Sequence, residues 1–518
     1  MENIVNKILY SKGDKTVPDY TKEIERRRTF AIISHPDAGK TTLTEKFLLY
    51  GGAINLAGSV KGKATARHAV SDWMEIEKER GISVTSSVLQ FKYDDFCINI
   101  LDTPGHQDFS EDTYRTLMAA DSAVMVIDAS KGVEAQTIKL FKVCVMRHIP
   151  IFTFINKMDR EARDSFELLD DIESVLGIRT CPVNWPIGSG KRFKGIYDRR
   201  AKTVRTFESV STGGAKSAAE TDYDINDPAL KELATEELYD QLIDEIELLD
   251  GASDPLDLEQ VQKGELSPVF FGSALTTFGV ETFLKYFLEM TTSPLPRMSN
   301  EGEIDPLTND FSAFVFKIQA NMNKAHRDRI AFLRICSGKF QADKEVYHVQ
   351  SGRKLRLSQP QQIMAQDRQV ISEAYAGDVI GVFDPGLFSI GDTITMPGSK
   401  FEYEGIPTFA PEHFARVIQL NSMKRKQFVK GITQIAQEGA IQIFQEYTAG
   451  MSEIIVGVVG VLQFDVLKYR LENEYGCEIR LESLPYGFIR WVGDPTTDVT
   501  KLKRMNNVKA VKDMKGNP

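Results

Sequence analysis

Cysteine and long apolar runs are both scarce in this chain, and their scarcity removes several classes of protein. The five cysteines are scattered and never spaced as C-x-x-C, so the sequence supports neither a disulfide framework nor a thiolate zinc site. The longest strongly apolar stretch lies around residues 454–462 and is far too short to span a bilayer. Residues 1–30 lack the apolar core of a signal peptide. We therefore expect reduced core cysteines, no membrane segment and a cytoplasmic protein.

A surplus of basic residues is absent as well. The chain has 63 lysines and arginines against 73 acidic residues, a formal net charge of −10, which argues against a globally basic surface for nucleic acid. Local clusters can still contact phosphate groups. Three are present: the arginines at 26–28, the basic run 424–426 with Lys430, and a group comprising Lys501, Lys503, Arg504, Lys509, Lys512 and Lys515. We expect the run at 424–426 in particular to meet RNA phosphates.

What the chain does have is material for several domains. It contains 518 residues, 42% of them hydrophobic, which suggests about three domains. Between residues 30 and 294, short apolar runs alternate with helical stretches; the clearest runs are 97–101, 123–127, 151–155 and 269–271. Strands this apolar are typical of a mostly parallel sheet covered by helices. We therefore predict an α/β domain over 1–295.

Two parts of this first domain depart from that pattern. Residues 1–25 are polar and unpatterned, and we predict an N-terminal extension there. We also predict an insertion near 180–265. Within it, the Gly-, Ala- and Ser-rich stretch 211–226 is expected to be a loop and the acidic run 236–250 a solvated helix.

The rest of the chain predicts two smaller domains. Three prolines between 294 and 306 indicate a linker, and the short β-rich segments that follow, such as 314–318 and 379–382, are separated by Gly and Asp turns. This pattern favours a β-barrel domain over 296–398. Strand-like and helix-like segments then mix, which favours an α+β domain over 399–518.

The segment Ser34-His35-Pro36-Asp37-Ala38-Gly39-Lys40-Thr41-Thr42 is the most informative in the chain. It follows an apolar strand and precedes a helix, and in such a loop the backbone N–H groups and the positive end of the helix cradle phosphates. Lys40 can reach the β- and γ-phosphates, and the Thr41 hydroxyl can bind Mg²⁺. The common form of this phosphate loop has Gly where this chain has Ser34. The loop predicts a nucleoside triphosphate site.

A second motif, Asp102-Thr103-Pro104-Gly105-His106, follows the strand that ends at residue 101. The carboxyl ends of parallel strands meet at one edge of a sheet, so we expect Asp102 beside the phosphate loop, holding Mg²⁺ through water. Gly105 has no Cβ, which lets its N–H approach a γ-phosphate closely.

Two further segments predict that the base is guanine. Asn156-Lys157-Met158-Asp159 follows the strand at 151–155, and its carboxylate can accept hydrogen bonds from the N1–H and amino group of guanine while the lysine stem lies along the ring. Adenine would leave that acceptor unpaired, which discriminates by a factor on the order of 10⁴. Ser273-Ala274-Leu275 follows the strand at 269–271, and a backbone N–H there can donate to guanine O6. The chain is therefore expected to bind GTP and GDP.

Together with Arg80-Gly81-Ile82-Ser83, these segments resemble the translational GTPases, the family of elongation factor G, and the resemblance covers nearly the whole chain. Within that family, segments 32–40, 72–75, 80–83 and 457–465 are most similar to the bacterial release-factor branch. The resemblance implies a ribosome-dependent GTPase that promotes departure of the class I release factors, which read stop codons. It also implies a ribosomal partner and a monomer.

The resemblance also implies roles for particular residues. His106 would orient the attacking water while Lys40 neutralises the developing charge. Until the ribosome reorders it, the histidine would be turned away behind apolar side chains, here Pro36 and Ile82. Ser83 stands where most relatives have threonine, and we expect it to bind Mg²⁺ in preference to Thr85. Asp37 matches a position proposed to help bind a monovalent cation; its alternative role is to cap the loop.

Other roles remain open from the sequence. Elongation factor G and the ribosome-protection proteins share these motifs but are longer, and the residues after about 401 leave no room for their further domains, which favours a termination role. A non-ribosomal GTP switch is the alternative from a different class, and the predicted barrel and His106 argue against it. A scaffold without catalysis is disfavoured because each phosphate-contacting position is filled.

Overall fold

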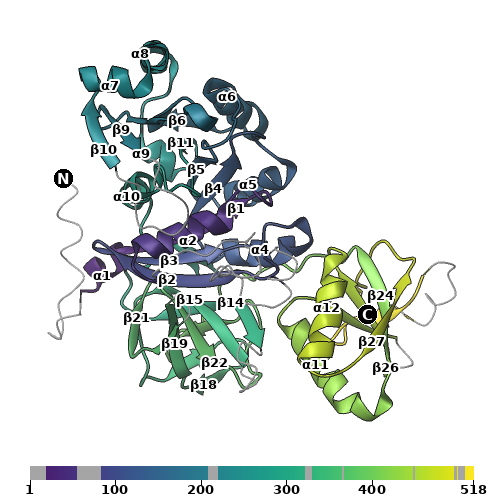
Figure 1. The fold of residues 1–518 in the computed structure, drawn as a ribbon. Coiled ribbons are helices and arrows are strands. Elements are labelled where there is room, and N and C mark those ends of the chain that lie inside the picture. Colours follow the sequence, from purple (N-terminus) through teal and green to yellow (C-terminus); the bar gives the residue numbers. More distant parts are fainter. Residues whose placement is uncertain are drawn as a thin grey trace, which may run out of the picture.

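The computed structural model describes residues 19–54, 77, 83–207, 220–320, 329–364, 367–446, 450–494, 497, 499 and 508–518. Along these ranges the chain forms an α/β domain, a β-rich domain and a C-terminal α+β domain, which confirms the predicted fold class (Figure 1). No helix in these ranges combines the length and apolarity needed to cross a bilayer. All five cysteines are free thiols.

A mostly parallel sheet forms the centre of the first domain, with the strand order β2-β3-β1-β4-β5-β11-β6. Only β2 runs antiparallel, against β3. The strands of this sheet are β1 (Arg27–Ser34), β2 (Ser87–Tyr93), β3 (Phe96–Asp102), β4 (Ser122–Asp128), β5 (Ile151–Asn156), β6 (Arg179–Pro182) and β11 (Leu266–Phe271). Neighbouring residues of a strand point to opposite faces, so a strand buried on both sides reads as a continuous apolar run.

Helices cover both faces of this sheet. Ala31 and Ile33 of β1 pack with α4 (Ser110–Leu117), α5 (Ala135–Met146) and α6 (Ser165–Leu176). Phe30 and Ile32 face α2 (Lys40–Tyr50) and α10 (Val280–Met290) on the other side. The two apolar layers hold the carboxyl ends of the strands, and the loops that follow them, in a fixed relation.

The predicted insertion contains an antiparallel sheet and helices. Its elements are β7 (Asn184–Ile187), η3 (Gly190–Arg192), β8 (Gly195–Asp198), β9 (Thr203–Phe207), β10 (Glu220–Asp224), α7 (Pro228–Ala234), α8 (Glu236–Ala252) and α9 (Leu258–Gln262). The acidic run therefore forms the predicted helix. The prediction of a loop over 211–226 is wrong for residues 220–224, which form β10 and pair with β9. Residues 208–219 lie outside the described ranges. This edge strand carries no apolar alternation, and Arg205 holds it through both carboxylate oxygens of Asp222.

The predicted N-terminal extension is ordered at its end. A short helix, α1 (Thr21–Glu25), buries Ile24. Residues 1–18 lie outside the described ranges.

The second domain is a curled β structure. Its main sheet has the order β18-β17-β23-β14-β15-β22-β19-β20, and a separate pair joins β16 to β21. The strands are β14 (Ser312–Ala320), β15 (Arg329–Ser337), β16 (Lys339–Gln341), β17 (Val346–His348), β18 (Arg353–Leu355), β19 (Ser358–Met364), β20 (Asp367–Val370), β21 (Glu373–Tyr375), β22 (Val379–Phe383) and β23 (Thr393–Thr395). A hairpin of β12 (Arg297–Ser299) and β13 (Gly302–Ile304) precedes it.

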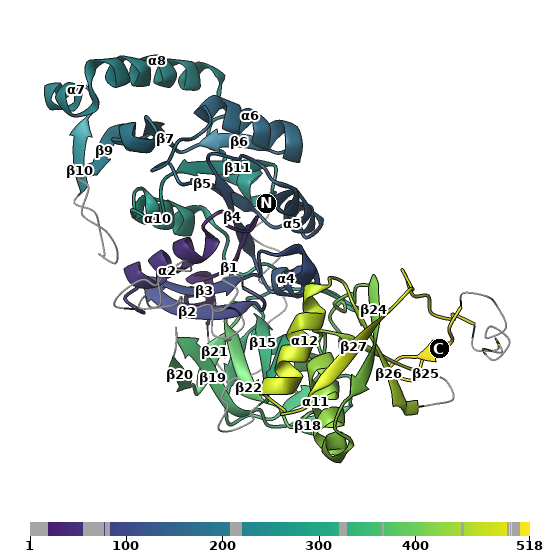
Figure 2. The same ribbon diagram turned by 45° about the vertical axis from the view of Figure 1, so that its right-hand side comes forward.

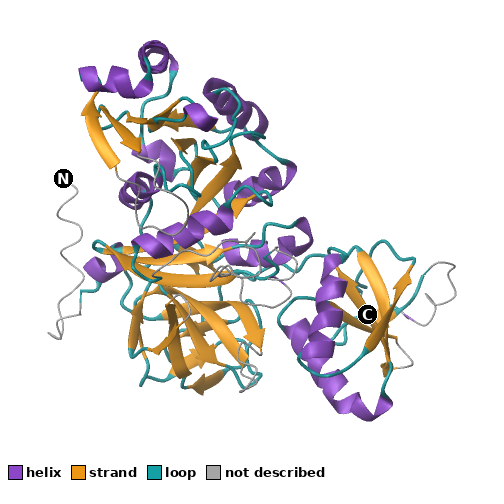
Figure 3. Cartoon of the chain, in the orientation of Figure 1, coloured by secondary structure: helices purple, strands orange, loops and turns teal. Residues whose placement is uncertain are grey.

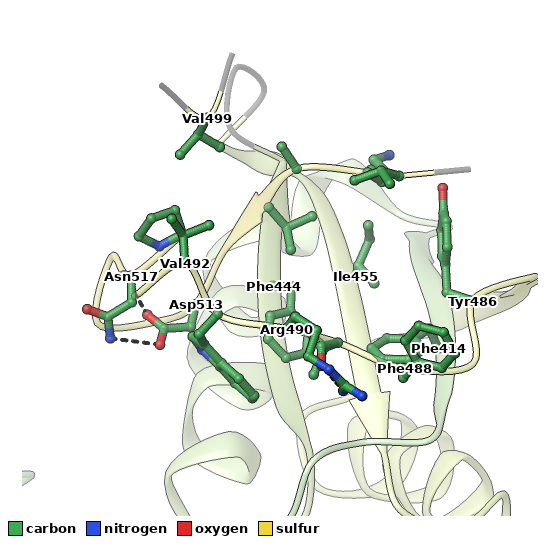
Figure 4. A pocket seen from close by; sticks show the side chains of 17 residues that line it. Phe414, Phe444, Ile455, Tyr486, Phe488, Arg490, Val492, Val499, Asp513 and Asn517 are labelled. Carbon is green, nitrogen blue, oxygen red and sulfur yellow. Dashed lines mark hydrogen bonds between the residues drawn. The ribbon is translucent and has the colours of Figure 1, made fainter. Parts of the chain in front are cut away.

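The third domain packs two helices on one face of a sheet with the order β27-β24-β26-β25-β28 (Figure 3). Its elements are β24 (His413–Gln419), η4 (Ser422–Lys424), α11 (Arg425–Gln437), β25 (Gln442–Glu446), β26 (Gly450–Val458), α12 (Leu462–Asn473), β27 (Ile479–Leu484) and β28 (Val511–Lys512). On the opposite face, Phe414, Phe444 and Ile455 line a cavity of about 260 Å³ together with Tyr486, Phe488 and Val492 (Figure 4). This domain lies beside both others (Figure 2).

Candidate functional site

The nucleotide-binding candidate is a cavity of about 270 Å³ where several strand-end loops of the first domain meet. It is lined by most of the predicted site residues: Ser34, His35, Pro36, Asp37, Gly39, Lys40, Thr41, Thr42, Ser83, Gly105, His106, Asn156, Lys157, Asp159 and Leu275. Arg160 lines it too. Loops that lie far apart in the sequence thus converge because β1, β3, β5 and β11 are parallel strands of one sheet.

The phosphate loop connects β1 to the first turn of α2. Gly39 caps α2 with a φ of 100°, in the left-handed region that favours glycine. A Cβ at this position would lie 2.2 Å from Nδ2 of Asn156. Close approach and backbone conformation both require glycine here, and the N-terminus of α2 faces the cavity with its orphan N–H groups.

Lys40 lines this cavity and pairs with Asp102, which is not among its lining residues. The Lys40 Nζ lies 2.5 Å from Oδ1 of Asp102, and both side chains are buried. Thr44 Oγ1 donates to the same carboxylate oxygen at 3.4 Å. A bound phosphate would attract the lysine, and a divalent cation would attract the aspartate. The pair therefore suits a site where phosphate and cation separate the two side chains.

The residues after Asp102 support the wall of the cavity from behind. Thr103 is buried and donates through Oγ1 to the Ile32 carbonyl at 2.7 Å. The Pro104 carbonyl accepts from Thr113 of α4 at 3.3 Å. Gly105 faces Pro36, whose Cα would lie 3.5 Å from an added Cβ. Contacts with β1, α4 and the phosphate loop thus hold residues 103–105 of this segment.

One side chain, Asn156, ties three loops together. Its Nδ2 donates to the Ala38 carbonyl and its Oδ1 accepts from the Ala274 N–H, both at 2.8 Å. Asp159 accepts from Ser273 Oγ at 2.5 Å. Ala274 is fully buried, whereas Leu275 lies exposed at the rim. The segments predicted to read the base therefore form one hydrogen-bonded unit with the phosphate loop.

Lys157 is held by a residue that the sequence analysis missed. Its Nζ donates to Oδ2 of Asp128 at 2.6 Å and also to the Asp37 carbonyl. Burial opposes ionisation of Asp128, but hydrogen bonds from Lys157 and Ser130 outweigh it and hold the pKa of Asp128 below its ordinary value. Asp128 ends β4, so its position at a strand's carboxyl end was a usable signal. A second missed residue is Glu134, whose Oε1 lies 3.3 Å from Nε2 of His35. Glu134 precedes α5 and does not end a strand, so its position gave no comparable signal.

His106 is the N-cap residue of the short 3-10 helix η2 (Gln107–Phe109). Its side chain is partly exposed on the cavity wall. Its Nδ1 accepts from the Asp108 N–H at 3.2 Å, and its ring packs edge-on against Phe109. Pro36 lines the same cavity. Ile82, the other predicted apolar neighbour, lies outside the described residues, as do 72–75 and 80–81.

The residues present fit a Mg²⁺ ion bound together with phosphates. Among the described residues, no group of three or more His, Cys, Asp or Glu side chains could hold a metal ion alone. Mg²⁺ takes few protein ligands and keeps water and phosphate oxygens, and Thr41, Ser83 and Asp102 offer hydroxyl and carboxylate oxygens of the right kind.

Comparison with known proteins defines the class first. Residues 25–293 match the elongation factor Tu GTP binding domain, residues 310–396 match elongation factor G domain 2, and residues 403–518 match the class II release factor RF3 C-terminal domain. The chain is therefore a translational GTPase, which hydrolyses GTP. It binds GTP and GDP, and Mg²⁺ is usual in this class.

Relatives narrow the class to one family. Peptide chain release factor 3 of Symbiobacterium thermophilum is 61% identical over 91% of this chain and 89% of its own length. The proteins of that name from Gloeobacter violaceus and a Cyanothece strain are 57% and 55% identical over 92% and 96% of this chain, and over 89% and 91% of their own lengths. The chain belongs to the peptide chain release factor 3 family.

A solved structure of a Thermus thermophilus protein shares the fold. It superimposes with a TM-score of 0.71 at 22% identity, covering 88% of this chain and 67% of the other. The family membership confirms the predicted release-factor GTPase.

Proposed function

We propose that this GTPase acts on the ribosome during translation termination and promotes the dissociation and recycling of class I release factors. The observation that carries this proposal is the match of residues 403–518 to the class II release factor C-terminal domain, on a chain whose strand-end loops converge on one nucleotide cavity. We further propose that it works as a monomer in the cytoplasm.

The contacts described above support the following arrangement for GTP. Backbone N–H groups of residues 37–41 would hold the β- and γ-phosphates, with Lys40 leaving Asp102 to neutralise their charge. Asp159 would accept from the guanine N1–H and amino group, and the stem of Lys157 would lie along the ring. The Ala274 N–H donates to Asn156 and so supports the base-reading loop; it would have to leave that acceptor to donate to guanine O6.

The bound Mg²⁺ would neutralise charge on the phosphate oxygens, with Thr41 and Ser83 as direct ligands and Asp102 acting through water. His106 would place the attacking water, and the Gly105 N–H would contact the γ-phosphate. Asp37 would contribute to a monovalent cation site. Because this chemistry is mostly positioning, hydrolysis is expected to be slow without ribosomes.

The test is the release of a labelled class I release factor from terminated ribosomes. We expect the chain with GTP to accelerate dissociation, and the chain with GDP or the Lys40→Ala variant with GTP to accelerate it far less. Dissociation at the unassisted rate with GTP would contradict the proposal and favour an elongation or ribosome-protection role. GTP hydrolysis that does not respond to ribosomes would favour a non-ribosomal switch.

A further inference from the structure

The carboxylate of Asp108 lies between His106 and the third domain. Its Oδ1 is 3.4 Å from Nδ1 of His106, and its own N–H donates to that nitrogen at 3.2 Å. The Asp108 side chain is only 9% exposed. The residue therefore touches the His106 ring through both its backbone and its side chain.

The other oxygen of the same carboxylate belongs to an interdomain contact. Oδ2 of Asp108 accepts from the Leu462 N–H at 2.8 Å, across 354 residues of sequence. Leu462 is the first residue of the 12-residue helix α12, so this N–H has no partner within the helix and carries the positive end of its dipole. A carboxylate is the group that such a helix end prefers.

Gly460 brings the third domain close enough for this contact. A Cβ at residue 460 would lie 2.3 Å from Cβ and Cγ of Asp108 and 2.5 Å from its Cα. The φ of Gly460 is not in the left-handed region, so the close approach, and not backbone conformation, requires glycine.

The loop that presents Leu462 is itself rigid. Gln463 Oε1 accepts from the N–H groups of Val459 and Gly460 at 2.9 and 3.0 Å, and its Nε2 donates to the Ala440 carbonyl. Beside it, Phe109 packs against Val84 and Val466 of α12 in a small apolar cluster. A movement of the third domain would therefore move the atom that holds Asp108.

We propose that Asp108 is a positioning residue, which makes the placement of His106 depend on docking of the third domain. A simple docking contact would account for the bond from Leu462, but Asp108 also holds Nδ1 of His106 through its own N–H, so the residue that docks the third domain is also the one that fixes the ring. The inference rests on the proposed catalytic role of His106.

The experiment measures single-turnover GTP hydrolysis by the full chain, with and without ribosomes, together with affinity for a fluorescent GDP. We compare Asp108→Ala, Gly460→Ala, and each of them combined with His106→Ala. Gly487→Ala is the matched control, because a Cβ there meets no atom within 4 Å and it lies in the same domain. Thermal unfolding midpoints report whether any variant fails to fold.

We expect Asp108→Ala and Gly460→Ala each to slow hydrolysis by about tenfold or more, with GDP affinity changed less than about twofold. Asp108→Asn should lose less, because one oxygen remains to accept from Leu462. In the His106→Ala background neither change should slow hydrolysis further, since Asp108 acts through His106. A change that only damages the fold would lower the active fraction in both backgrounds.

Unchanged hydrolysis in Asp108→Ala, or an equal loss with and without His106, would overturn the proposal. Faster hydrolysis would overturn it too, since docking would then hold His106 back. If wild-type hydrolysis does not respond to ribosomes, the proposed function fails, while the ribosome-free comparison of the same variants still decides the role of Asp108.

Discussion

At the scale of single residues, the nucleotide site depends on side chains that serve two loops at once. Asn156 spans the phosphate loop and the Ala274 segment, and Lys157 spans Asp128 and the Asp37 carbonyl. Asn156, Ala274 and Asp128 are buried, so removing a partner of one of them leaves a polar group unsatisfied at a cost of about 1–3 kcal/mol, whereas the Asp37 carbonyl is exposed. The segments predicted to read the base and to hold the phosphates are therefore linked before any ligand binds.

Asp159→Asn tests base recognition. The amide presents a donor where guanine also donates, so we expect GDP affinity to fall by about 100-fold or more, while affinity for xanthosine diphosphate, whose O2 is an acceptor, rises. Titration with both fluorescent nucleotides measures the change. The hydrogen bond from Ser273 can persist to the amide oxygen, so Ser273→Ala is the control for loop disorder. Guanine selectivity equal to that of the wild type would contradict the assignment.

His106→Ala tests catalysis. We expect GTP and GDP affinity to stay within about twofold, because the ring is partly exposed on the cavity wall, while ribosome-stimulated hydrolysis falls by about 100-fold or more. Rapid-quench measurement of phosphate release gives the rate. His413→Ala, at an exposed histidine of the third domain outside the cavity, is the matched control. Stimulated turnover at the wild-type rate in His106→Ala would remove His106 from the mechanism.

At the scale of elements, the sequence predicted what is local and missed what is distant. The strand, loop and helix at 30–42 form one continuous pattern, so the phosphate loop was readable from the chain. Asp128 was within reach, since it ends a strand. The Asp108 contact with Leu462 joins residues 354 positions apart, and no local pattern encodes such a pairing. β10 was missed because an edge strand exposed on both sides needs no apolar alternation.

The basic clusters show the same limit. Arg27 pairs with Asp378 at 2.9 Å, and Arg28 donates to the Leu288 carbonyl with its guanidinium over Phe96. Two of the three arginines at 26–28 thus serve the fold. Contact of the cluster at 424–426 with RNA phosphates stays a prediction.

Helix α4 is joined to the residues before β2 through Asp112, which predicts a pH dependence. Oδ2 of Asp112 accepts from the N–H and hydroxyl of Ser86 at 2.7 and 2.6 Å, and Lys317 of β14 donates to the Ser86 carbonyl and hydroxyl. Burial opposes ionisation, but the Lys317 charge and the Ser86 hydrogen bonds outweigh it and lower the pKa of Asp112. The stabilisation is therefore present above the ordinary aspartate pKa and is lost as the pH falls through the lowered one.

The measurement is the urea midpoint of wild type and Asp112→Asn from pH 7 down to pH 3. We expect the variant to be less stable at pH 7 and the difference to shrink as the pH falls below the ordinary aspartate pKa, because the unfolded wild type then takes up a proton that the folded protein resists. Asp95→Asn, an exposed change of the same charge, should show almost no difference at either pH. A gap for Asp112→Asn that is constant across this range would show that ionisation of Asp112 does not stabilise the fold.

At the scale of the whole molecule, the first two domains share a polar interface. Arg334 Nη2 lies 2.6 Å from Oδ2 of Asp121, and its Nη1 donates to the Gly377 carbonyl at 2.6 Å. That carbonyl also accepts from Thr29 of β1 at 2.5 Å. Buried and directional bonds of this kind fix how the second domain sits against the sheet of the first.

Arg334→Met tests this interface. The side chains of Arg334 and Asp121 are 4% and 6% exposed, and burial raises the pKa of Asp121 despite the Arg334 charge. Removing Arg334 leaves that carboxyl buried without its partner, and we expect the free energy of unfolding to fall by about 3–5 kcal/mol. Urea unfolding followed by circular dichroism measures the loss. Arg192→Met removes a surface ion pair with Glu237, whose side chains are 58% and 77% exposed, and should cost less than about 1 kcal/mol.

A double variant separates the two contributions of the buried pair. In Asp121→Leu with Arg334→Met no unpaired charge remains, so most of the loss should be recovered, although the Leu295 N–H, which donates to Oδ1 of Asp121 at 3.0 Å, loses its acceptor. Single and double variants with equal losses would show that desolvation of Asp121 is not the cause. If Arg334→Met lowers the free energy of unfolding no more than Arg192→Met does, the buried pair contributes no more than an exposed one. Other contacts would then hold the two domains together.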